Sequence, residues 1–300
     1  MCAQSTVPRR GVYPRIVTTI LKTIAEAREA LVDPRTNGTI ALVPTMGALH
    51  EGHLSLVRLA KEHADFVVVS IFVNPTQFGP GEDFDRYPRT FDEDVALLEG
   101  AGVDAVFAPA VDEMYPKGLD QTLVTGGPAS RILEGAHRPG HFDGALTIVH
   151  KLVSIIEPDL AVFGEKDAQQ LFLVRAMVDD LNLRTAIVGA PINREDDGLA
   201  RSSRNRYLSA ADRELALRLS AALRAADGAA DADAARQIGR ECLDGNGIVL
   251  DYFELVDPST FLPVEGAHTG TALAVLAARV GTTRLIDNQL LMLGVSAAVN

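Results

Sequence analysis

The feature that most constrains the fold is a regular alternation of β-rich apolar runs with helix-like segments over the first two-thirds of the chain. The sequence predicts short strands over residues 39–43, 66–73, 105–108, 160–163 and 184–189. Helices are expected between them, over 92–101, over 168–181 and in a longer segment that Pro158 ends. Leu54, Val57, Ala60 and Ala64 form an apolar stripe at helical spacing. This β-α-β rhythm predicts an α/β fold with a Rossmann-like parallel sheet and helices on both faces.

The character of the sequence changes after Pro191. Ser209, with Asp212 three residues later, is typical of a helix N-cap, and an Ala- and Leu-rich helix should run from it to residue 226. We expect residues 227–235 to be a helix end and a loop, followed by strands at 252–256, 272–276 and 283–286. The sequence therefore predicts two domains, a Rossmann-like one over 1–192 and a smaller α+β one over 193–300.

Composition and charge exclude several function classes. Hydrophobic residues make up 47% of the chain and charged residues 23%, a balance typical of globular proteins. The net charge of −12 argues against a nucleic-acid partner. No apolar run reaches the roughly 20 residues that span a bilayer, and the first residues do not resemble a secretory signal. The two cysteines, Cys2 and Cys242, cannot form a disulfide framework, so we expect a cytoplasmic protein.

Two histidines open the helix that follows the first strand, in the run Pro-Thr-Met-Gly-Ala-Leu-His-Glu-Gly-His at residues 44–53. His50 and His53 are three residues apart and share one face of the first turn. Free amide hydrogens and the helix dipole favour a phosphate there, and imidazoles can donate hydrogen bonds to its developing charge. The alternatives are surface or capping histidines, or a metal site with only two ligands.

Further candidates follow other predicted strands or lie at the domain junction. Lys166, within residues 164–167, can bind phosphates as a mobile charge or can be a solvated lysine. The run Arg201-Ser202-Ser203-Arg204 suits phosphate oxygens if a lid closes, or is a polar linker. Gln77, in Asn-Pro-Thr-Gln-Phe at 74–78, can bind a hydroxy acid or can belong to a simple turn. His141 is a further phosphate donor or a helix-terminal histidine.

Together these motifs resemble the nucleotidylyltransferase superfamily and, more specifically, the pantothenate synthetase family. The matching segments lie at residues 44–53 and 74–78, at 83–89 (Asp-Phe-Asp-Arg-Tyr-Pro-Arg), at 164–167, at 202–208 and at 281–288 (Gly-Thr-Thr-Arg-Leu-Ile-Asp-Asn). They occur in the family's order and cover all but the N-terminal part of the chain. Three positions depart from the family's usual residues: Arg201 replaces Met, Asn193 replaces Val and Ala168 replaces an aromatic residue.

The resemblance implies a ligase that uses ATP and Mg²⁺ to convert pantoate to pantoyl adenylate, then joins it to β-alanine to give pantothenate and AMP. It implies catalytic roles for His53, His50 and Lys166. The ATP-binding positions that it implies are Met46, Gly47, Ala48, Leu49, His50, Glu51, Gly52, His53, Gly164, Glu165, Lys166, Asp167, Asn193, Arg201, Ser202, Ser203 and Arg204. Gln77 and Gln170 match the family's pantoate-binding glutamines, and Gln77 also lies where β-alanine arrives.

The family resemblance also implies a C-terminal lid domain and a homodimer. The Mg²⁺ ligands stay unknown, with Asp92 and Asp94 as candidates. Two other functions compete with the ligase: a nucleotidylyltransferase that retains AMP or CMP in its product, and a module that binds ATP without turnover. A dinucleotide-binding enzyme is disfavoured, because no Gly-x-Gly-x-x-Gly follows the first strand.

Overall fold

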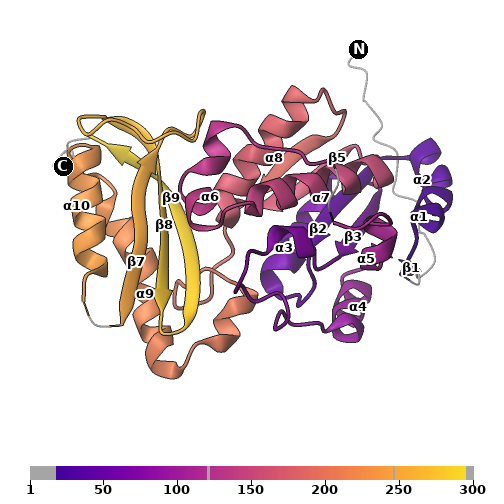
Figure 1. Ribbon diagram of the computed structural model, residues 1–300, viewed down its shortest axis with the longest axis horizontal. Helices are drawn as coiled ribbons and strands as arrows, with labels where there is room; N and C mark the ends of the chain where they lie inside the picture. The colour runs from indigo at the N-terminus through magenta and orange to yellow at the C-terminus, as the bar shows by residue number, and fades with distance from the viewer. Residues whose placement is uncertain (1–17, 120–121, 246, 295–300) are drawn as a thin grey trace, which may run out of the picture.

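The computed structural model describes residues 18–119, 122–245 and 247–294, and it contains two sheets side by side (Figure 1). The larger sheet has six strands in the order β1-β4-β3-β2-β5-β6, and every pairing in it is parallel. Its strands are β1 (Thr19–Leu21), β2 (Ile40–Thr45), β3 (Phe66–Ile71), β4 (Ala105–Phe107), β5 (Leu160–Gly164) and β6 (Ala186–Ala190). The predicted parallel sheet is confirmed, and the ends of its predicted strands lie within two residues of the observed ends.

Helices cover both faces of this sheet because its strands are apolar on both sides. In β2, Ile40 and Leu42 face one core while Ala41 and Val43 face the other, as the two-residue period of a strand requires. The first core also contains α1 (Ile24–Ala30), α7 (His141–Ile156) and α8 (Ala168–Asp180). The second contains α3 (Glu51–His63) and α4 (Phe91–Gly100). Shorter elements are α2 (Val32–Asn37), η1 (Pro75–Gln77), α5 (Val111–Met114), η2 (Pro128–Arg131), α6 (Glu134–His137), η3 (Glu165–Asp167) and η4 (Ser203–Tyr207).

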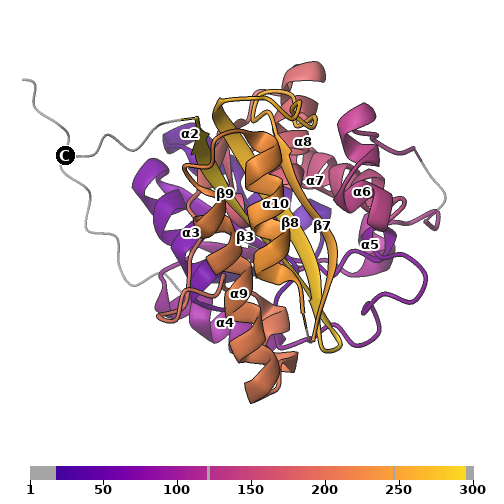
Figure 2. The ribbon, with the colours of Figure 1, turned by 90° about the vertical axis from the view of Figure 1, so that its left-hand side faces the viewer.

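The C-terminal part is an antiparallel sheet, β7 (Ile248–Val256), β8 (Gly270–Val280) and β9 (Thr283–Leu293), in that order. Two helices, α9 (Ala210–Ala226) and α10 (Ala232–Leu243), pack against it around a core of their own (Figures 1 and 2). The Ser209 side chain accepts a hydrogen bond from the Asp212 backbone at 3.1 Å, so the predicted N-cap is confirmed. The α+β character of this part is confirmed, although its strands are longer than predicted.

The prediction of a helix end and loop over residues 227–235 is wrong in its second half, because α10 begins at Ala232. Asp231 caps it by accepting from the Ala234 backbone at 2.9 Å. The buried face of α10 consists of Ala232, Ala235, Gly239 and Leu243, most of which have small side chains. At Gly239 the missing side chain makes room for Phe253, since a Cβ there would lie 2.3 Å from the ring. β1, α1 and α2 were also not predicted.

Strand register brings three of the predicted motifs to one edge of the parallel sheet. Thr45, the last residue of β2, pairs with Ile71, the last residue of β3. β5 pairs with β2 on its other side and ends at Gly164. The segments that follow these three strands therefore leave the sheet at neighbouring carboxyl ends, where open α/β sheets bind ligands.

Candidate active site

The loop that joins β2 to α3 is held in a conformation that ordinary residues avoid. Gly47 has φ +82° and Ala48 has φ +50°, both in the left-handed region. Asp94 fixes this loop, because its two carboxylate oxygens accept the backbone N–H groups of Ala48 at 2.9 Å and Leu49 at 2.7 Å. Asp94 is buried at the first turn of α4. The loop is therefore preformed, and its strain is of the kind found at ligand sites.

His50 and His53 form a reciprocal cap at the N-terminus of α3. Nδ1 of His50 accepts the Gly52 backbone N–H at 3.1 Å, and Nδ1 of His53 accepts the His50 backbone N–H at 3.3 Å. The ring centroids are 4.1 Å apart. A neutral imidazole has one donor and one acceptor nitrogen. Since each Nδ1 accepts, the proton of each ring is assigned to Nε2, which leaves two N–H donors.

Electrostatics keep both rings neutral. Burial lowers the pKa of His50 to about 4, and the positive charges of Lys166 and Arg201 contribute to this shift. Burial lowers the pKa of His53 to about 3, with His50 and Lys166 as further causes. The pair therefore donates from neutral Nε2–H groups at neutral pH. The charge of Lys166 thus acts on both rings, and that of Arg201 acts on His50.

Lys166 lies in η3, immediately after β5, and the C-terminal sheet holds this turn in place. The Nδ2 group of Asn288, on β9, donates to the carbonyls of Glu165 and Lys166, both at 2.9 Å. The neighbouring Asp287 accepts a bidentate pair from Arg194 at 2.7 and 3.0 Å. The Ile-Asp-Asn end of the 281–288 motif thus ties the second sheet to the turn that carries Lys166.

The Ser-Ser-Arg segment, residues 202–204, lies at the junction of the two sheets. Ser202 caps η4 by accepting from the Arg204 backbone at 3.3 Å. Asn193 is brought beside this segment, because its carbonyl accepts the Arg201 backbone N–H at 2.9 Å. The Nε atom of Arg201 is buried and lacks a hydrogen-bond partner among the described residues, a state that an acceptor such as phosphate would relieve.

The two glutamines and His141 occupy different surroundings. Gln77 is buried, and its amide nitrogen lies 3.0 Å from Sδ of Met46. Gln170 and its neighbour Gln169 both line the cavity described below, and Gln169 is buried and hydrogen-bonded to the backbone of residues 129–134. Both ring nitrogens of His141 are engaged, one by Arg138 at 3.0 Å and one by the Gln77 carbonyl at 2.8 Å. Of the two alternatives for His141, these contacts favour the helix-terminal histidine at the start of α7 over a phosphate donor.

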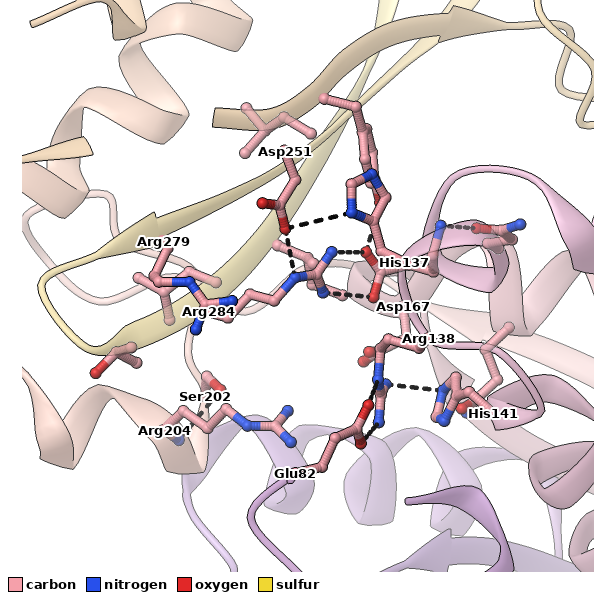
Figure 3. Close-up of a pocket in the computed structure, with 18 of the residues that line it drawn as sticks. Glu82, His137, Arg138, His141, Asp167, Ser202, Arg204, Asp251, Arg279 and Arg284 are labelled. Carbon is pink, nitrogen blue, oxygen red and sulfur yellow. Dashed lines mark hydrogen bonds and ion pairs between the residues drawn. The ribbon is translucent and has the colours of Figure 1, made fainter. Parts of the chain in front are cut away.

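A cavity of about 810 Å³ separates the two sheets (Figure 3). Lys166, Asp167, Gln170, Ser202 and Arg204 are among the residues that line it. The histidine pair, Met46, Gln77 and Arg201 are not part of this lining. Gln77 adjoins the cavity through His141, which lines it and contacts the Gln77 carbonyl at 2.8 Å. Five of the predicted residues, Lys166, Asp167, Gln170, Ser202 and Arg204, therefore share one cavity.

The sequence interpretation missed an ion-pair network in the wall of this cavity. Glu134 is buried in α6 and accepts hydrogen bonds from both terminal nitrogens of Arg284, at 2.7 and 2.8 Å. Tyr252 donates to the same carboxylate at 2.7 Å, and Asp251 accepts from Nε of Arg284 at 2.6 Å. Burial raises the pKa of Glu134, but the hydrogen bonds and charge of Arg284 and Tyr252 leave it below the usual value. Arg284 belongs to the 281–288 motif, and that motif was the only indication in the sequence of this ion-pair network.

The described residues contain no group of three or more His, Cys, Asp or Glu arranged to hold a metal ion. Asp94, one candidate ligand, already uses both oxygens on backbone amides, while Asp92 is exposed on α4. In the same described part of the chain, no helix is long and apolar enough to cross a membrane. Cys242 is a free thiol, and Cys2 lies outside the described residues.

Comparison with known proteins agrees with this geometry. The chain is 52% identical to pantothenate synthetase of Acidothermus cellulolyticus over 276 residues, 90% of each chain. It is 56% identical to that of Thermobifida fusca over 263 residues, covering 84% of this chain and 89% of the relative. The solved pantothenate synthetase of Thermus thermophilus superposes with a TM-score of 0.85 at 47% identity, over 91% of this chain and 99% of that one.

A second solved structure is that of a complex with ligands. The pantoate–β-alanine ligase of Francisella tularensis, in complex with β,γ-ATP and β-alanine, superposes with a TM-score of 0.77 at 35% identity, over 91% of this chain and 97% of that one. The sequence model that describes pantoate–β-alanine ligases matches residues 19–290, from β1 into β9. With the fold, the motif order and nearly the full length shared, the chain belongs to the pantoate–β-alanine ligase family.

Proposed function

We propose that this chain condenses pantoate with β-alanine at the expense of ATP, in the region bounded by the β2–α3 loop, η3 and η4. The family membership and the high identity over most of each relative make the chain an ATP-dependent ligase of this type. The observation that supports the site most directly is the neutral histidine pair, with its two Nε2–H donors at a helix N-terminus beside Lys166. Backbone amides and donors preset in this way stabilise charge that develops on a phosphate.

In the first half-reaction, a pantoate carboxylate oxygen attacks the α-phosphorus of ATP. The bond from that phosphorus to the bridging oxygen breaks, and pyrophosphate leaves with the electron pair. We assign hydrogen bonding to the α-phosphate to His50 and His53. Lys166, Arg201 and Arg204 would neutralise the transferred and departing phosphates, because guanidinium and ammonium groups match phosphate oxygens.

The remaining predicted residues have supporting roles in this scheme. Met46 to Leu49 would give the nucleotide a preformed backbone surface, which Asp94 fixes by accepting two of its N–H groups. Ser202 and Ser203 would donate hydrogen bonds from their hydroxyls to phosphate. Asn193, whose carbonyl accepts the Arg201 backbone N–H, would contact the nucleotide through its backbone. Gln77 and Gln170 would orient pantoate.

In the second half-reaction, the uncharged amine of β-alanine attacks the acyl carbon of pantoyl adenylate. The bond from that carbon to the phosphate oxygen breaks, AMP leaves, and the amine loses a proton. Adenylation is needed because a carboxylate is a poor acyl donor, whereas AMP is a good leaving group. The intermediate must be kept from water until the amine arrives, and the enclosed position between the two sheets suits this need.

Mg²⁺ is the cofactor that the family resemblance implies, and the described residues do not offer it a carboxylate cage. Mg²⁺ commonly binds through substrate phosphates and water with few protein ligands. We therefore propose that the ion arrives with ATP, and the catalytic steps above are assigned to side chains of the protein alone.

We also propose a division into domains at residues 192 and 193, with the C-terminal part acting as a lid. Its separate hydrophobic core supports this division. A homodimer and a cytoplasmic location are proposed from the family resemblance. Sedimentation of the purified chain would contradict the dimer if it gave the mass of one copy.

The decisive experiment measures exchange of labelled pyrophosphate into ATP with Mg²⁺, with and without pantoate, in the absence of β-alanine. Exchange that requires pantoate is expected, because only the first half-reaction then runs in reverse. His53→Ala should retain the fold but lose about 10²–10³-fold in exchange rate, the usual effect of removing one charge-stabilising donor. His63→Ala, at the exposed end of the same helix, is the matched control. Absence of exchange in the folded wild type would reject the ligase.

A further inference from the structure

The loop that joins β3 to α4, residues 79–90, contacts both sides of the cavity through two adjacent carboxylates. Glu82 accepts a bidentate pair from Arg138 at 2.6 and 2.8 Å, beside the proposed pantoate site. Asp83 accepts from Arg204 at 3.1 and 3.2 Å, on the proposed phosphate side. Both carboxylates line the cavity (Figure 3 labels Glu82 and the two arginines). The 79–90 loop thus connects the two substrate regions.

This loop is a fixed scaffold, because aromatic packing holds it together. The Phe84 ring packs 5.4 Å from Phe78, which also contacts Tyr87 at 6.0 Å. Arg89 lies 5.3 Å over the Phe84 ring and donates to the carbonyls of Phe84 and Tyr87, both at 3.2 Å. The carboxylate of Asp83 is therefore presented from a rigid base.

The contact between this loop and the Ser-Ser-Arg segment extends beyond one ion pair. Tyr207, at the end of η4, donates to the Arg86 carbonyl at 3.4 Å. The loop and η4 are therefore joined at two points, so the position of one depends on the other.

The geometry of the ion pair leaves part of the guanidinium available. Asp83 binds Arg204 side-on, through Nε and Nη2. The Nη1 group takes no part in this pair, and Arg204 lines the cavity. A guanidinium has five N–H donors in a planar fork, so one edge can bind a carboxylate while another binds phosphate.

We propose that Asp83 is a positioning residue for ATP, which holds Arg204 so that its free edge faces the triphosphate. The proposal deepens the proposed function and depends on it. An arginine side chain loses considerable rotamer freedom when it binds a ligand. A carboxylate that fixes the side chain beforehand removes that cost from ATP binding.

Charge alone argues for the opposite effect, since the Asp83 carboxylate lies near the proposed phosphate site and should repel an anion. Arg204 contacts that carboxylate at two atoms, which largely offsets its charge. We therefore expect positioning to outweigh repulsion. The two effects predict opposite changes in ATP affinity.

The test replaces Asp83 by its isostere in the full chain. Asp83→Asn should weaken binding of a non-hydrolysable ATP analogue, measured by calorimetry, by about tenfold, the scale of one immobilised long side chain. The KM for ATP in pantoate-dependent exchange should rise equally, with the KM for pantoate within about twofold. Asp85→Asn removes the same charge from an exposed position in the same loop, and should leave both constants unchanged. Tighter analogue binding by Asp83→Asn would overturn the proposal in favour of repulsion.

A double variant shows whether Asp83 acts through Arg204. Asp83→Asn should add nothing to the loss in Arg204→Ala, because coupled residues are not additive. Full additivity, or equal effects on both KM values, would indicate a merely structural role and overturn the proposal. Should Asp83→Asn fail to fold, Arg204→Lys keeps the charge without the two-nitrogen contact. Wild-type ATP affinity in that variant would also overturn the proposal. Failure of the proposed function is distinguishable, since the wild type itself would then lack exchange.

Discussion

Replacing Gly52 by Ala should separate the activity of this site from the stability of the fold. A Cβ at position 52 would lie 2.9 Å from both Cε1 and Nδ1 of His50. Contacts below 3.0 Å are not tolerated, so the ring must move by several tenths of an ångström. The backbone need not move, because Gly52 lies in α3 outside the left-handed region. The substitution therefore displaces one proposed phosphate donor and little else.

The two consequences differ in size. Ala is better than Gly in a helix by about 1 kcal/mol, and the weakened cap between Nδ1 of His50 and the Gly52 amide costs about 0.5–2 kcal/mol. Net stability should stay within about 1 kcal/mol, a shift in Tm of roughly 2–4 °C. A misplaced catalytic group can cost about 10²-fold in rate. Exchange should thus fall far more than stability.

The assay pairs thermal unfolding with pantoate-dependent pyrophosphate exchange. Gly100→Ala is the matched control, because it adds the same methyl group to the end of α4 with no atom within 4 Å. It should keep wild-type exchange. Wild-type exchange in Gly52→Ala would show that the position of His50 does not matter to the first half-reaction, and the assignment of its Nε2–H donor would be abandoned.

Three further predictions concern stability. Burial lowers the pKa of His141 to about 4, so the unfolded chain binds its proton first as pH falls from 6.5 to 4. The stability that His141 contributes should drop there by about 1.4 kcal/mol per pH unit, in addition to the similar contributions of His50 and His53. His141→Gln should remove its share of the slope in urea unfolding at pH 5 and 7. Asp94→Asn places an amide donor against one of two backbone N–H groups, which should cost about 1–3 kcal/mol and lower exchange, with exposed Glu93→Gln as control. Glu134→Gln removes one of the two carboxylates that pair with Arg284, while Asp251 remains, and calorimetry should show a loss of about 1–3 kcal/mol.

The parallel sheet could be predicted because its strands are short, apolar on both faces and separated by periodic helices. The missed elements are short or bury mainly small side chains. β1 has only three residues. α10 is amphipathic, and it buries Ala232, Ala235, Gly239 and Leu243. The polar residues that precede it favoured a loop, although Gly239 makes room for the Phe253 ring.

The candidate site could be proposed from the sequence where its residues are contiguous. The histidine motif, the 164–167 segment and the 201–204 segment were found because each combines several chemical groups at a strand or helix end. The ion pairs were not, because Asp83 and Arg204 are 121 residues apart and Glu134 and Arg284 are 150 apart. Any carboxylate in the chain is a formal candidate for such a pairing, and only the fold selects one.

The histidines show why residue type alone cannot separate a phosphate donor from a structural residue. Nδ1 of His50 and of His53 faces a backbone N–H, which can only donate, so the proton of each ring resides on Nε2. His141 has the opposite arrangement. Arg138 can only donate to its Nε2, so Nδ1 carries the proton and donates to the Gln77 carbonyl. Three neutral imidazoles thus divide into two with a donor left for a ligand and one with none, because their partners fix the tautomer.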